Sequence, residues 1–78
     1  MVATMVTYRV QYLSVYRSTL LRTGIAPHES DWMTDAAEYL TPVQASNAAT
    51  DMAGHRGACV RVVKIISTVI PLTDKEIS

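Results

Sequence analysis

Few residues of this chain combine the types and the spacing that chemistry requires. The single cysteine, Cys59, follows His55 by four positions. A nucleophilic thiolate–imidazole pair needs the two side chains in contact and a third group that orients the base. Cys59 stands in a valine-rich stretch, where a cysteine usually serves as a small buried apolar residue. The pair therefore does not predict catalysis.

The carboxylates and glycines give no stronger signal. His28, Glu29 and Asp31 form a polar group in a loop, but a metal site would need a further well-spaced ligand. Asp35 and Glu38 could act as an acid–base pair only inside a pocket. The three glycines fit no phosphate-binding or dinucleotide-binding pattern. We therefore expect a protein that is not an enzyme and that uses no cofactor and no metal.

Length and composition predict one small domain that spans residues 1–78. The mean hydropathy is +0.14, which in so short a chain favours a partner or a second copy that covers leftover apolar surface. No apolar run reaches the roughly 18 residues of a membrane span. The first residues lack the pattern of a secretory signal, and one cysteine cannot form an internal disulfide framework. These features predict a cytoplasmic protein, either a monomer or a homodimer, without membrane contact.

One stretch carries a well-defined helix signal. Thr41 can cap a helix, Pro42 fits its first position, and Gln44 can complete a capping box. The helix is expected to end at Gly54, with Gly57 as the alternative. Its buried face is predicted from the helical spacing of Ala45, Ala48, Ala49 and Met52.

Strands are expected on both sides of this helix. Residues 6–12 alternate between apolar and polar, and residues 58–66 are rich in Val and Ile. The second stretch has Arg61 and Lys64 three apart, which predicts either a bulge or a buried strand with charges at its ends. Residues 19–25 suggest the second strand of a hairpin. Residues 30–40 fit a helix or, preferably, a loop and a short strand over 36–40. Residues 72–78 are expected to fray.

The predicted architecture is thus α+β, a small antiparallel sheet of three to four strands with one main α-helix packed on one face. Charge is segregated along the chain although the net charge is zero. If the basic segments share the sheet, one side of the molecule is cationic and another is anionic. The basic candidate surface for a partner consists of Arg9, Gln11, Arg17, Arg22, Arg61 and Lys64. The alternative acidic surface consists of Glu29, Asp31 and Asp35.

Residues 36–66 resemble small phage-encoded proteins, including anti-CRISPR proteins that inhibit type I systems. The resemblance rests on a short strand, on Thr41-Pro42 opening an alanine-lined helix, and on the GACVRVVK stretch that begins at Gly57. It implies a phage-type binding protein in the host bacterial cytoplasm, which inhibits a host complex such as a CRISPR-Cas effector by steric blockade. Two alternatives stay open, namely a nucleic-acid-binding module with a basic sheet face and a homodimeric regulatory or structural domain.

Overall fold

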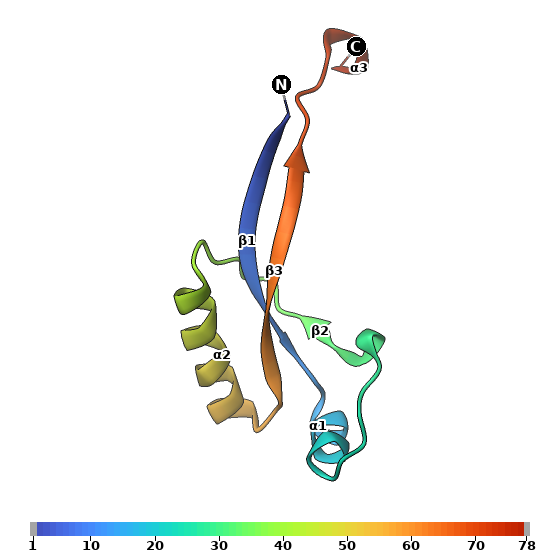
Figure 1. Ribbon diagram of the computed structural model, residues 1–78, viewed down its shortest axis with the longest axis vertical. Coiled ribbons are helices and arrows are strands. Elements are labelled where there is room, and N and C mark those ends of the chain that lie inside the picture. The colour runs from blue at the N-terminus through green and yellow to red at the C-terminus, as the bar shows by residue number, and fades with distance from the viewer. Residues whose placement is uncertain (1, 78) are drawn as a thin grey trace.

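The computed structural model describes residues 2–77, which is the whole chain except its first and last residue (Figure 1). Three strands form an antiparallel sheet in the order β2-β1-β3. The strands are β1 (Ala3–Tyr12), β2 (Met33–Thr34) and β3 (Val60–Val69). The helices are α1 (Val15–Arg22), α2 (Pro42–Arg56) and the short α3 (Asp74–Ile77). The predicted α+β class, with an antiparallel sheet and one main helix, is confirmed.

Helix α2 forms where its capping signals predict it. The Thr41 hydroxyl accepts a hydrogen bond from the Gln44 amide at 3.2 Å. At the other end Gly57 adopts a left-handed backbone with φ of 62°, and its amide donates to the Ala53 carbonyl. The expected end at Gly54 is wrong, because the turn that needs positive φ falls at Gly57. Gly54 lies inside the helix.

The core lies where α2 crosses β1 and β3. Ala45 and Ala49 of α2 are buried, and so are Val10 of β1 and Leu13, which directly follows β1. Ala48 and Met52 are half-buried, so the predicted apolar stripe faces the sheet. Small side chains on this stripe let the helix lie close to the sheet.

Strands β1 and β3 pair along their whole length, from Ala3 opposite Val69 to Tyr12 opposite Val60. Each residue has one partner, so β3 contains no bulge. Because side chains alternate between the two faces, Arg61 and Lys64 lie on opposite faces of the sheet. The strand extends three residues beyond the predicted Ile66 and ends before Pro71, which cannot donate to a ladder.

The strand predicted over residues 19–25 is wrong, because residues 19–22 belong to α1 and residues 23–25 form the turn that follows it. The Ser14 hydroxyl accepts a hydrogen bond from the Arg17 amide at 3.2 Å and caps the helix. Ser18 is fully buried, and its hydroxyl accepts the Cys59 amide at 2.8 Å. This contact joins α1 to the start of β3. A local sequence pattern could not predict it, because the two residues are far apart in the chain.

The strand preferred for residues 36–40 is also wrong, and so is a helix across residues 30–40. A 3₁₀ turn spans Glu29–Asp31, and β2 follows it at Met33–Thr34. Within residues 36–40 only Tyr39 pairs with β1, through two backbone hydrogen bonds of 2.8 Å with Tyr8. These bonds hold an otherwise irregular segment against the sheet.

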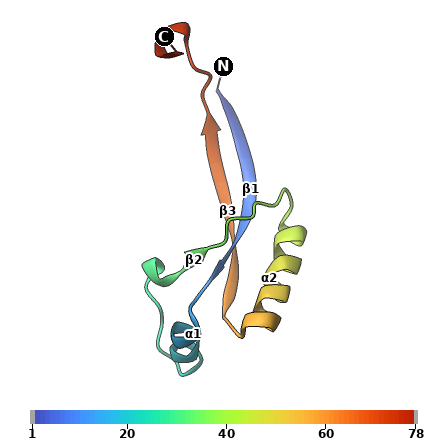
Figure 2. The ribbon, with the colours of Figure 1, turned by 180° about the vertical axis from the view of Figure 1, so that it is seen from behind.

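The molecule is elongated, with extents of 54 × 25 × 18 Å. Figures 1 and 2 show α2 and β2 beside one half of the β1–β3 ribbon, while the other half projects away with both termini at its tip. We call this projecting part, residues 3–7 and 65–69, the arm; the rest of the folded chain is the body. The tail predicted to fray contains α3, a single turn in which the Thr73 amide donates to Glu76. Among residues 2–77, no helix combines the length and the apolar character needed to cross a membrane.

Candidate interaction surfaces

The side chain of Arg61 is the centre of a group of contacts on the sheet face opposite α2. Its guanidinium carbon lies 4.3 Å from the centroid of the Trp32 ring. Its Nε donates to Gln11 Oε1 at 2.8 Å, and its two terminal nitrogens donate to the Glu29 carboxylate at 3.2 and 2.5 Å. We call Gln11, Glu29, Trp32 and Arg61 the Arg61 cluster. Stacking and a bidentate carboxylate together fix the plane of the guanidinium.

Register places these residues together. Gln11 of β1 is opposite Arg61 of β3 on one side and opposite Thr34 of β2 on the other. The Gln11 amide nitrogen donates to Thr34 Oγ1 at 3.1 Å while its oxygen accepts from Arg61. Trp32 directly precedes β2, so its ring reaches the same face as Arg61. The cluster thus joins all three strands.

The ion pair within the cluster shifts the pKa of both partners in the direction that favours their charged forms. The hydrogen bond from Arg61, followed by the attraction between the opposite charges, lowers the pKa of Glu29 below its ordinary value. The hydrogen bond with Glu29 raises the pKa of Arg61. The Glu29 side chain is 83% exposed, so solvent screens the pair and it contributes little to folding stability. Its main consequence is the fixed position of Arg61.

Arg9 anchors the segment that follows β2. Its Nε and one Nη donate to the Asp35 carbonyl oxygen at 3.0 and 2.7 Å. The carboxylate of Asp35 takes no part in these two bonds. Arg9 lies two residues before Gln11 on β1 and therefore on the same face as the Arg61 cluster.

The other predicted basic residues lie apart. Arg17 of α1 approaches Asp31, with 3.7 Å between Nε and the carboxylate. Arg22 donates to the Gly57 carbonyl at 2.6 Å and so ties the end of α1 to the end of α2. Lys64 is exposed on the opposite face of β3. Of the six basic-surface candidates, Arg9, Gln11 and Arg61 therefore lie together, Arg17 borders them through Asp31, and Arg22 and Lys64 lie elsewhere.

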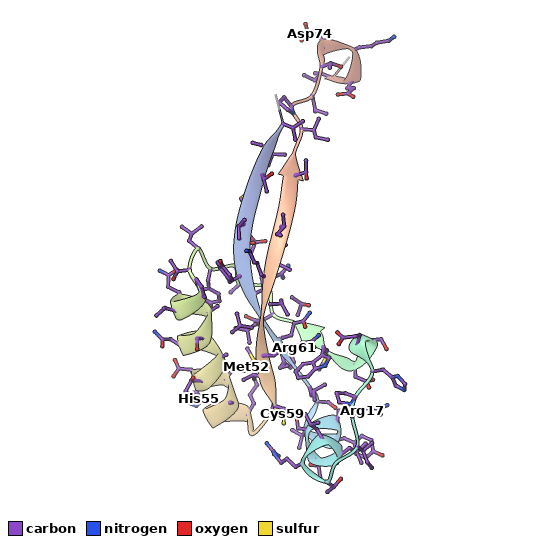
Figure 3. The ribbon with its side chains drawn as sticks, viewed as in Figure 1. Arg17, Met52, His55, Cys59, Arg61 and Asp74 are labelled. Atoms are coloured by element: carbon purple, nitrogen blue, oxygen red, sulfur yellow. The ribbon has the colours of Figure 1, made fainter. Side chains whose placement is uncertain are left out.

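The acidic candidates do not form a separate surface. Glu29 pairs with Arg61 and Asp31 with Arg17, so the two predicted surfaces interlock. The expected division of the molecule into a cationic and an anionic side is wrong at these two pairs. The cause is the loop before β2, which brings the acidic segment across the sheet to the arginines of β3 and α1 (Figure 3).

Two features escaped the sequence-based search. Trp32 is not among the sequence-based site candidates, yet it is half-buried and its ring lies against Arg61. The arm was also missed. Its sequence signal is the absence of any charged residue among residues 1–8, together with a second uncharged and mostly apolar stretch over residues 65–70.

The remaining chemical candidates are not assembled. Cys59 Sγ contacts the Ser18 carbonyl at 3.9 Å, whereas His55 is exposed on α2 and Figure 3 shows it directed away from Cys59. His28 uses its backbone amide to bond Asp31 at 2.9 Å. Within residues 2–77 there is neither a pocket nor a group of three potential metal ligands among His, Cys, Asp and Glu.

Comparison with protein-family models, with curated proteins and with solved structures gives no match to this chain. The resemblance to anti-CRISPR proteins therefore stays a hypothesis.

Proposed function

We propose that this chain is a non-catalytic protein-binding module and that the Arg61 cluster, with the neighbouring Arg9, is its partner-binding surface. The observation that carries the proposal is the fixed guanidinium of Arg61, which is stacked on Trp32 and bonded by Gln11 and Glu29. Tryptophan and arginine dominate the binding energy of many interfaces. A side chain already held in one conformation loses little entropy on binding.

The cluster presents both signs of charge to a partner. Arg61 is one third exposed, at 33% of its side chain, and Glu29 is largely exposed. A partner that packs against the Trp32–Arg61 stack and offers a basic group to the exposed Glu29 carboxylate would match this pattern and would be selected by it. A surface of mixed charge of this kind suits a folded protein.

The same contacts give less support to nucleic-acid binding. The donors of Arg9 and Arg61 already have acceptors within the chain, and Arg17 lies beside a carboxylate. A phosphate would have to compete with these acceptors, and the net charge of zero adds no long-range attraction. Direct binding of RNA or DNA that falls steeply with salt would support this alternative instead.

The more specific version of the proposal is inhibition of a host complex by steric blockade, in the manner of anti-CRISPR proteins, within a bacterial cytoplasm. It rests on the resemblance over residues 36–66 and on the small size of the chain. The bound module would cover a site on the complex and exclude the natural ligand.

A pull-down from bacterial lysate, with and without nuclease, tests the proposal when wild type is compared with two variants. Arg61→Lys keeps the positive charge but loses the bidentate fork and the flat stacking surface, so we expect about 2 kcal/mol or more of binding energy to be lost. Lys64→Ala is the matched control, because it removes a charge from the same strand on the opposite face. A partner that binds Arg61→Lys as well as wild type, or that requires Lys64, would contradict the proposal.

A further inference from the structure

The arm gives this chain more surface than a compact protein of its mass. The radius of gyration is 16.6 Å, whereas a compact domain of this length has about 11.5 Å. The accessible surface is 5757 Å², whereas a compact monomer of 8.6 kDa exposes about 4,700 Å². The excess of about 1,000 Å² is comparable with the roughly 800 Å² that each partner buries in a standard protein interface.

The extra surface of the arm is apolar. Met5 is 48% exposed, and its neighbours on the ribbon are also exposed, namely Val6, Ile66 and Val69. Figures 1 and 2 show from opposite sides that neither α2 nor β2 reaches this part of the ribbon. A two-stranded ribbon without a covering layer is only marginally stable in water. Apart from Thr7 at its base, which is buried, the arm therefore lacks a layer that the body has.

The outer edge of β1 in the arm is open to another strand. The amide and carbonyl of Tyr8 point away from β3, because both bond to Tyr39. Backbone direction alternates along a strand, so the amides and carbonyls of Thr4 and Val6 point to the same side. Within residues 2–77 no strand pairs with β1 there. The open edge thus extends from Ala3 to Thr7.

The two outer edges of the ribbon differ in charge. The open part of the β1 edge, residues 3–7, contains no charged residue. The outer edge of β3 has no neighbouring strand within residues 2–77, and it contains the exposed Lys64 near its centre, just outside the arm. A lysine on an edge strand opposes pairing with another strand. Two β3 edges that met near their centres would bring two lysines together, whereas two β1 edges would bring no like charges together.

We propose that two copies of this chain dimerise through the open β1 edges of their arms, across a two-fold axis at Met5. The axis falls at Met5 because this residue is the midpoint of the open edge. Thr4 of each copy then exchanges backbone hydrogen bonds with Val6 of the other, and Met5 lies opposite Met5. The result is a four-stranded antiparallel sheet in the order β3-β1-β1-β3.

The pairing is limited to residues 3–7 of each copy. The amide and carbonyl of Tyr8 already bond to Tyr39, so residue 2 of one copy must leave the ladder before it reaches Tyr39 of the other.

Two proline substitutions test which edge is used, with mass in solution as the measurement. Thr4→Pro removes an amide that points out of the β1 edge, and Thr68→Pro removes the equivalent amide of its cross-strand partner on the β3 edge. Neither amide serves the β1–β3 ladder, so both variants keep the arm. We expect wild type and Thr68→Pro at twice 8.6 kDa and Thr4→Pro at 8.6 kDa. A monomeric wild type at several hundred micromolar, or a dimer lost only in Thr68→Pro, overturns the proposal.

A cysteine placed on the two-fold axis tests the register of the β1–β1 pairing independently of the stability of the variant. In a Cys59→Ala background, Met5→Cys would place two thiols at a non-hydrogen-bonded pair, with Cα atoms about 4.5 Å apart and within disulfide range. Val6→Cys is the control, because it lies opposite Thr4 and not opposite its own counterpart. With oxidised glutathione as oxidant, we expect a covalent dimer of Met5→Cys only. Equal cross-linking of both variants would overturn the two-fold axis at Met5.

The dimer and the partner-binding surface can fail separately. Arg61 lies opposite Gln11, which is seven residues along β1 from Thr4, or about 24 Å away. A monomeric Thr4→Pro that still binds the partner would leave the proposed function intact. An Arg61→Lys variant that keeps the dimer mass but loses the partner would leave the dimer intact.

Discussion

Val10 and Val6 are the same residue type on the same face of the same strand, yet one is fully buried and the other is 38% exposed. The difference arises from α2, which covers β1 in the body and stops before the arm (Figure 1). One strand thus serves as core at one end and as open surface at the other. The alternation of side chains along β1 is the same in both halves of the strand. Which of these side chains are buried depends on how far α2 extends over the strand.

The largest expected effect is the difference in stability between the alanine variants of Val10 and Val6. Val10→Ala removes two buried methyl groups from a site closed by α2, so we expect a loss of about 2 kcal/mol in the free energy of unfolding. Val6→Ala, measured by urea unfolding in the monomeric Thr4→Pro background, should cost less than about 0.5 kcal/mol.

Both valines contribute the same side chain, so their difference measures the covering by α2 directly. If the two substitutions cost the same in the monomer, the arm must be covered by another part of the chain, and the contrast between body and arm would be wrong. If Val6→Ala becomes costly only when the chain dimerises, the neighbouring β1 strand of the second copy shields the Val6 side chain from solvent.

The part of the fold that the sequence predicted is the part governed by local rules. Thr41 and Pro42 specify the start of α2 through backbone geometry alone, and the alternation of residues 6–12 specifies a strand. Residues 19–25 were assigned to a strand because β-branched residues favour one. The hydrogen bond between Ser18 and Cys59 supports a helix here instead. These two residues are 41 positions apart, so no local sequence pattern contains their contact.

The sequence likewise predicted only part of the candidate surface. Residue type identified Arg9, Gln11 and Arg61, because arginine and exposed polar positions on strands favour interfaces. Their association with the acidic loop could not be predicted, since it depends on β2 pairing with β1 through only two residues, Met33 and Thr34. A strand so short has no periodicity to recognise. Trp32 was missed for the same reason.

A smaller effect tests where α2 ends, at the end of the body that lies farthest from the arm (Figure 1). Gly57 has a φ of 62°, which an L side chain adopts only with strain, so we expect Gly57→Ala to destabilise the protein by about 1 kcal/mol. Gly54→Ala is the matched substitution inside the helix, where an added methyl group meets no atom within 4 Å. There alanine is the better helix former and should stabilise by about 0.5–1 kcal/mol.

Thermal unfolding of the two glycine variants gives the signs directly. Opposite shifts of the melting temperature are expected. A destabilised Gly54→Ala together with a neutral Gly57→Ala would place the end of α2 at Gly54, as the sequence alone suggested, and would shorten the layer that covers the body.

The smallest effect concerns the open face of the body, where Glu29 meets Arg61. Because the hydrogen bond from Arg61 lowers the pKa of Glu29 in the folded protein, this carboxylate favours the folded state at pH values above its ordinary value of 4.5. The contribution is lost as the pH falls through the lowered pKa. Its size is slight, since the carboxylate is exposed. An NMR titration of the Glu29 side chain should therefore show a midpoint below 4.5, which returns to the ordinary range in Arg61→Ala and does not in Lys64→Ala.

This titration distinguishes a fixed cluster from a transient contact. A bidentate pair that holds the guanidinium for most of the time must lower the Glu29 midpoint, because protonation of the carboxylate removes an acceptor that Arg61 uses. An unshifted midpoint would mean that Arg61 samples many conformations in solution. The body would then expose an unorganised face, much as the arm exposes an uncovered one, and preorganisation would no longer distinguish the Arg61 cluster as the binding surface.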